Sequence, residues 1–169
     1  MVDPVEFVDA MRDYFAGEKA AGLLLAGAGV LFLAATAYAA RTHTGGFMLG
    51  LAIPLGVVGL AALVGGIVLF VKTGPQVDAL VELYNRSATD FLAQELPRMQ
   101  KVNANWPRLE TVWTIMIAVA LGSIWLSSRE WLHGLALALL VVGTLAMCTD
   151  VISERRARVY IARIEALGR

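Results

Sequence analysis

The chain has 169 residues, of which 58% are hydrophobic and 17% charged, whereas soluble domains average about 45–50% apolar and about 25% charged residues. The excess of apolar residues excludes an ordinary water-soluble domain, and a net charge of zero gives no field that would favour nucleic acid. The single cysteine, Cys148, excludes an internal disulfide framework and a cysteine-based zinc site.

Four apolar blocks are long enough to cross a bilayer, which takes about 20 residues of helix. They cover residues 20–40, 46–71, 109–127 and 131–149, and none holds Asp, Glu, Lys or Arg deep inside. A backbone in lipid must satisfy its own hydrogen bonds, so each block is predicted to be a helix. The predicted fold class is all-α, a polytopic membrane protein with four transmembrane helices.

The first block could be mistaken for a signal peptide, because Ala37-Tyr38-Ala39 resembles a cleavage site. Residues 1–19 argue against this reading, since they carry five acids against two bases. They are predicted to form an amphipathic helix. Its start is marked by the cap-like sequence Asp3-Pro4-Val5-Glu6.

The polar stretch between the second and third blocks is predicted to form a helical connector over residues 75–106. Gly74-Pro75 is expected to stop the second span and start this new helix. Pro97 is expected to kink or end it, and the sequence "NANWP" to mark the return into the membrane. Its apolar residues recur at steps of three and four, which is typical of an amphipathic helix: Val77, Leu80, Val81, Tyr84, Ala88, Phe91, Leu92, Leu96 and Met99.

The last segment, residues 150–169, is predicted to be a basic tail helix. Its arginines are candidates for a surface that meets a partner or anionic lipid: Arg155, Arg156, Arg158 and Arg163. The tail carries a net charge of +2 and residues 1–19 a net charge of −3. We therefore expect the two ends and the connector to pack into one small bundle, with a lipid-bound tail as the alternative.

Lys and Arg counts set the orientation. The two terminal segments and the connector together hold twelve, and the two remaining loops hold one each. Both termini and the connector are therefore predicted to be cytoplasmic. The Arg-rich, Ala-rich composition hints at a bacterial cytoplasmic membrane.

Small residues in the second span are candidates for close helix packing or for the lining of a pore. They are Gly46, Gly50, Gly59, Ala62 and Gly66, together with the kink-forming Pro54. Packing inside one bundle and packing between protomers both fit this pattern.

We identify no catalytic, cofactor-binding or metal-binding residue. The spans lack the buried ionisable groups of a proton relay, and no phosphate-binding loop, nucleophile elbow or HExxH motif is present. His43 and His133 are expected to lie near the outer face without a role. Asp150 is expected to pair with an arginine, and Cys148 to be a buried, unreactive thiol or else a site of palmitoylation.

Three functions remain open. The first is a non-enzymatic membrane scaffold or regulatory protein, which presents its cytoplasmic helices to a protein partner or to a second copy. The second is a homo-oligomeric channel or small-solute pore. The third is an enzyme acting on lipid headgroups, with Glu110 and Asp150 at the interface. We expect membrane lipids and further copies of the chain as partners, and no nucleic acid.

Overall fold

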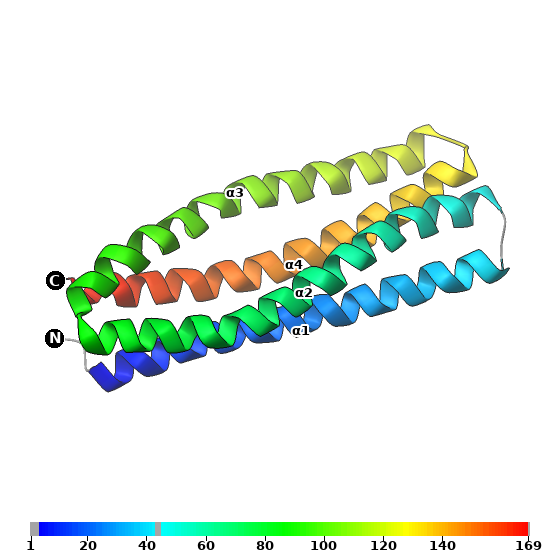
Figure 1. Cartoon of the computed structure of the whole chain (residues 1–169). Coiled ribbons are helices and arrows are strands. Elements are labelled where there is room, and N and C mark those ends of the chain that lie inside the picture. The colour runs from blue at the N-terminus through cyan, green and yellow to red at the C-terminus, as the bar shows by residue number, and fades with distance from the viewer. Residues whose placement is uncertain (1–3, 43–44, 169) are drawn as a thin grey trace.

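A computed structural model describes residues 4–42 and 45–168. These form four long α-helices: α1 (Pro4–Thr42), α2 (Gly46–Arg86), α3 (Ala88–Leu126) and α4 (Glu130–Leu167). All four are long and apolar enough to span a membrane, which confirms the predicted all-helical class. Each has 38 to 41 residues and therefore measures about 60 Å, roughly twice the hydrocarbon layer. The helices run alongside one another, and the first turn of α1 and the last turn of α4 lie at the same end of the molecule (Figure 1).

The helix breaks expected at Gly74-Pro75 and at Pro97 are absent. α2 continues through Pro75 to Arg86, and α3 contains both Pro97 and Pro107. The only break is at Ser87, whose hydroxyl accepts a hydrogen bond from the Asp90 backbone N–H at 3.2 Å. A proline removes one helical hydrogen bond, but tertiary packing overrides that cost here. The connector is thus a tight helical hairpin rather than a separate helix, and the cap residue Asp3 lies outside the described residues.

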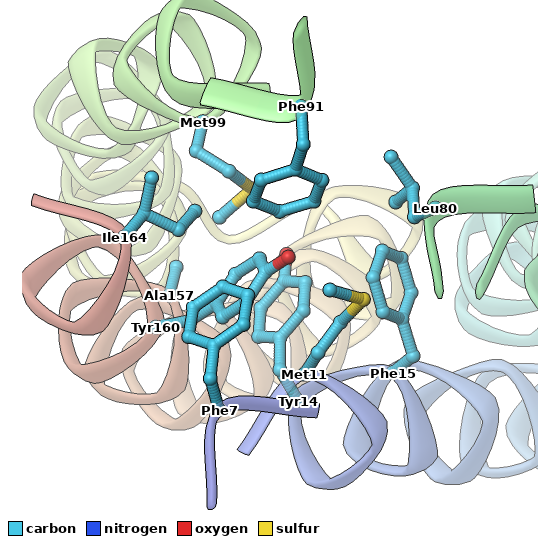
Figure 2. Packing of buried hydrophobic residues seen from close by; sticks show 10 residues of the cluster. All are labelled: Phe7, Met11, Tyr14, Phe15, Leu80, Phe91, Met99, Ala157, Tyr160 and Ile164. Carbon is cyan, nitrogen blue, oxygen red and sulfur yellow. The ribbon is translucent and has the colours of Figure 1, made fainter. Parts of the chain in front are cut away.

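The helix ends nearest the two termini pack around one aromatic core, shown in Figure 2. We call this part, residues 4–19, 72–108 and 150–167, the terminal bundle. Phe7 of α1 contacts Tyr84 and Phe91 at ring-centroid distances of 4.9 and 5.6 Å, and Tyr14 stacks on Tyr160 at 4.7 Å. The structure therefore packs the N-terminal, connector and C-terminal segments together. The apolar stripes of all four helices meet in this core: Phe7, Met11, Tyr14, Phe15, Leu80, Phe91, Met99, Ala157, Tyr160 and Ile164.

The apolar halves of the helices pack differently, through small residues. A Cβ added to Gly66 of α2 would lie 2.5 Å from the backbone of Gly22 and of Ala26 in α1. Likewise, a Cβ on Gly134 of α4 would meet the Phe47 carbonyl of α2. Within the described residues, α3 makes most of its contacts with α4, and α1 and α3 have no Cα atoms within 8 Å of each other. The membrane half is therefore held by close backbone contacts rather than by a large core.

Gly66→Ala should destabilise the protein, whereas Gly65→Ala should not. Both changes gain up to about 1 kcal/mol of helix propensity. Only the first forces a methyl group into the α1 backbone, an overpacking that typically costs about 1–3 kcal/mol. At Gly65 the nearest atom is a Leu25 methyl group, 3.9 Å away. The measurement is the midpoint of thermal unfolding in detergent, and equal midpoints for the two variants would contradict the packing described.

Candidate functional site

A large groove, with a volume of about 1270 Å³, lies in the apolar half of the described helices. It is bounded by α1, α2 and α4, and two tryptophans of α3 close one end. The volume exceeds the roughly 300–1,000 Å³ of common small-ligand pockets. Most of its lining is aliphatic, so within a bilayer the groove faces hydrocarbon. Along α1 it extends from Glu18 to Phe32, which is about 21 Å at 1.5 Å per residue.

One end of the groove is polar, and we call it the groove mouth: Glu18, Trp106, Trp113, Asp150 and Ser153. Four of them flank the apolar blocks and Trp113 lies in the first turns of the third block, so the mouth lies near the predicted level of the lipid headgroups. Asp150 Oδ2 accepts a hydrogen bond from Trp113 Nε1 at 2.7 Å. Sequence reasoning expected Asp150 to pair with an arginine or to be solvated at the interface, and did not anticipate this bond between α3 and α4.

Arg156 does not itself line the groove, but its guanidinium group adjoins two residues of the groove mouth, Glu18 and Ser153. Its Nη2 donates to Ser153 Oγ at 3.0 Å and is 3.9 Å from Glu18 Oε1, a separation too long for a hydrogen bond. Its Nε is covered and has no hydrogen-bond partner, as is also true of Trp106 Nε1. Burial raises the pKa of Glu18, and the Arg156 and Arg98 guanidinium groups only partly counter this effect. The mouth thus holds both signs of charge without a close ion pair.

Gly17 creates the space that Arg156 occupies. A Cβ at this position would lie 2.7 Å from Arg156 Cδ. The arginine side chain therefore passes over the bare backbone of α1 on its way to the mouth. This contact brings α1 and α4 together just below the groove.

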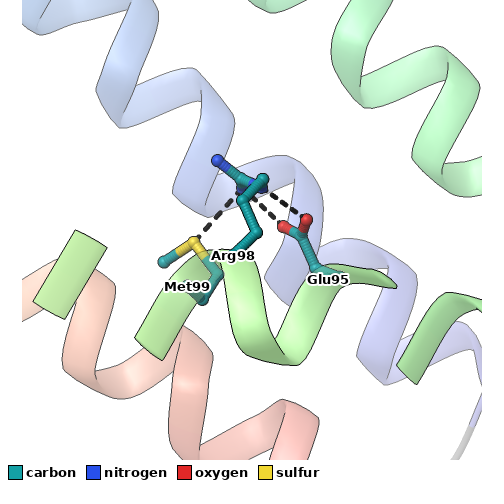
Figure 3. Close-up of polar contacts among 3 residues, drawn as sticks. All are labelled: Glu95, Arg98 and Met99. Atoms are coloured by element: carbon teal, nitrogen blue, oxygen red, sulfur yellow. Dashed lines mark hydrogen bonds and ion pairs between the residues drawn. The ribbon is translucent and has the colours of Figure 1, made fainter. Parts of the chain in front are cut away.

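A second polar feature is the Glu95–Arg98 pair of the terminal bundle (Figure 3), in which Glu95 is fully buried and the Arg98 side chain is 37% exposed. The Glu95 side chain is 0% exposed, and Arg98 donates from Nε and Nη2 to its two oxygens, both at 2.6 Å. The hydrogen bond to Glu95 raises the pKa of Arg98. Burial is the main reason that the pKa values of Tyr14 and Tyr160, which lie beside this pair, are raised as well.

Sequence reasoning missed the buried pair, although a signal was present. Phe91, Glu95 and Met99 recur every four residues, so they occupy one helix face. A carboxylate between two buried apolar residues on that face requires a buried partner, and Arg98 is one turn away.

The small residues singled out in α2 face its neighbours within the chain. Gly59 and Gly66 are buried against α1, and Ala62 is also buried. Gly46 and Gly50 approach Trp131 of α4. Pro54 lies inside α2 without ending it.

The four tail arginines have different surroundings. Arg156 approaches Glu18, and Arg163 pairs with Glu6 at 2.5 Å, so two of them link α4 to α1. Arg158 pairs with Glu154 of its own helix, and Arg155 is exposed.

The remaining candidates have ordinary surroundings. His133 Nε2 lies 2.7 Å from the Ser127 carbonyl oxygen, and His43 lies outside the described residues. Cys148 is exposed, contrary to the expectation of a buried thiol. The described part of the chain contains no cluster of three or more His, Cys, Asp or Glu side chains able to hold a metal ion.

Arg98→Met should destabilise the terminal bundle by about 3–5 kcal/mol, because it leaves the Glu95 carboxylate buried without its partner. The double variant Glu95→Leu/Arg98→Met should recover most of this loss. Arg86→Met is the matched control, since its ion pair with Glu82 is exposed and is expected to contribute no more than about 1 kcal/mol. Denaturant unfolding in detergent measures all three variants. An Arg98→Met cost no larger than that of Arg86→Met would contradict the buried pair.

Glu18→Gln should change how stability depends on pH. The pKa of Glu18 in the folded protein is raised above its ordinary value of 4.5. Its contribution to folding is therefore fully present below pH 4.5 and is lost as the pH rises through the raised value. The wild-type free energy of unfolding should fall in this window relative to that of Glu18→Gln. Parallel unfolding curves between about pH 4 and pH 8 would show that Glu18 is not desolvated.

No known protein family, no curated protein and no solved structure matches the chain. The groove, its mouth and the buried core beside them are therefore the features from which a function is inferred.

Proposed function

We propose that this chain is a non-enzymatic integral membrane interaction protein, whose groove holds another component of the membrane. We place it in a bacterial cytoplasmic membrane with both termini in the cytoplasm, on the grounds of composition and of the Lys and Arg counts.

The open groove is the observation that carries this proposal. Its volume of about 1270 Å³ lies between helices that pack closely on either side of it. The groove is open and most of its lining residues are apolar. Its lining atoms therefore make favourable dispersion contacts with an apolar component of the surrounding membrane that lies in it.

The terminal bundle changes one part of the scaffold hypothesis, namely the surface that meets the partner. Its aromatic core is buried, so a protein partner at this end would meet an outer face that is largely polar, with Val5, Ile152 and Val159 exposed on it. The groove, by contrast, leaves apolar side chains uncovered, such as Leu24 at 71% and Leu31 at 69% exposed.

The pore and enzyme readings have less support. The small residues suggested as a pore lining, Gly59 and Gly66, lie against α1. Asp150, suggested as a headgroup-processing acid, already accepts a hydrogen bond from Trp113.

Gly27→Phe should displace whatever occupies the groove. Gly27 lines the groove, and a Cβ there would have no neighbour within 4 Å. Gly122→Phe is the matched control, because a Cβ at that position is equally free and lies outside the groove. Native mass spectrometry of protein released from nanodiscs should show a bound mass for the wild type and for Gly122→Phe, and its loss for Gly27→Phe. Equal bound mass in all three would contradict the proposal.

A further inference from the structure

We propose that the groove binds a zwitterionic aminophospholipid, with an acyl chain along the apolar walls and the headgroup at the groove mouth. This inference rests on the proposed function and names the occupant of the same site. The shape of the groove and the charges of its mouth carry the inference.

The apolar part fits a lipid chain in one leaflet. With the mouth included, the walls of the groove run for about 21 Å along α1, 18 Å along α2 and 17 Å along α4, as given by their first and last lining residues. One leaflet contributes about 15 Å of hydrocarbon. The groove therefore runs parallel to lipid chains and covers the depth of the leaflet nearest the termini.

The polar end lies where a headgroup would lie. Glu18 and Asp150 directly flank the first and fourth apolar blocks, and the indole rings of Trp106 and Trp113 belong to the residue type that favours the membrane interface. A lipid whose chain follows the groove would bring its phosphate and headgroup to this level without further adjustment.

The charges of the mouth are complementary to a headgroup that carries both signs. Arg156 has no carboxylate within hydrogen-bond distance, since Glu18 is 3.9 Å away, and its side chain remains 30% exposed. The guanidinium group is therefore available to a phosphate oxygen, which it binds well. Glu18 and Asp150 supply two carboxylates that can accept hydrogen bonds from an ammonium group.

Asp150 and Arg156 are six residues apart on α4, a rise of about 9 Å. Both side chains are partly covered rather than free in solvent. At 100° per residue their side chains leave α4 about 120° apart, on either side of Ser153, which lines the mouth and accepts a hydrogen bond from Arg156. A headgroup lying across Ser153 would therefore reach both. A purely anionic lipid would place a phosphate beside two carboxylates and gain only one cation, so it fits less well.

A second copy of the chain is the competing occupant. Its apolar blocks hold no Asp, Glu, Lys or Arg deep inside, so a transmembrane helix lying in the groove would fill the apolar part without supplying an ammonium and phosphate pair. The mixed charges of the mouth therefore favour the lipid.

The test uses the full chain in nanodiscs with equal amounts of phosphatidylethanolamine and phosphatidylglycerol, followed by native mass spectrometry. The wild type should retain phosphatidylethanolamine about fivefold over phosphatidylglycerol, the effect of one favourable charge contact. Asp150→Asn keeps an acceptor for Trp113 and removes only the charge. This variant and Glu18→Gln should each lower the preference toward one.

Arg156→Gln should reduce the retention of both lipids, because both carry the phosphate. Arg158→Gln is its control, since Arg158 is exposed and pairs within α4, and it should behave as the wild type. Circular dichroism of each variant shows whether the helices remain folded. Should Arg156→Gln unfold, the two carboxylate variants still decide the outcome.

The outcomes separate the two proposals. Equal retention of both lipids, or a retained second copy of 18.1 kDa, would overturn the aminophospholipid while leaving an occupied groove. A bound mass that is indifferent to Gly27→Phe would overturn the groove itself as the binding site, and the lipid assignment with it.

Discussion

The structure depends on a change of solvent along each helix. Outside the bilayer, burying apolar side chains removes them from water and contributes roughly 25 cal/mol per Å². Inside the bilayer this driving force disappears, because lipid tails are as apolar as leucine. The terminal bundle accordingly uses large aromatic residues such as Phe7 and Tyr160, whereas the apolar halves associate through glycines such as Gly22 and Gly66. Each continuous helix therefore packs through large aromatic and apolar side chains in one half and through small residues in the other.

The groove follows from this difference. The aromatic core brings α1 and α4 together near the termini, but beyond Gly17 no comparable set of small residues joins them. Among the described residues, α1 contacts α4 far less than it contacts α2. The space between them opens at the predicted level of the membrane surface. Its mouth consequently combines two tryptophans with Glu18 and Asp150, and Arg156 adjoins it. Such a combination suits a molecule that is itself half polar.

The sequence predicts the coarse fold well, because 20-residue apolar blocks and an all-helical backbone follow directly from the bilayer. Its local signals mislead at Pro75 and Pro97, where tertiary packing of Leu80 and Met99 keeps the helices continuous. The face of Glu95 can be inferred from its four-residue spacing to Phe91 and Met99, but its partner cannot be fixed from spacing alone. The groove mouth lies beyond sequence reasoning, since Glu18, Trp113 and Asp150 come from three helices and meet only through the packing of the whole chain.

The separation of α1 and α4 within the membrane tests the account most directly. Spin labels at Leu24 and Leu145, on the two walls of the groove, would report it by pulsed electron resonance in lipid nanodiscs, with Cys148 replaced by serine. The account predicts one narrow distribution of distances between the two labels, centred on the separation of α1 and α4 in the structure. A dominant short distance, as expected if α1 packs directly on α4 through the bilayer, would show that no groove exists and would contradict the account.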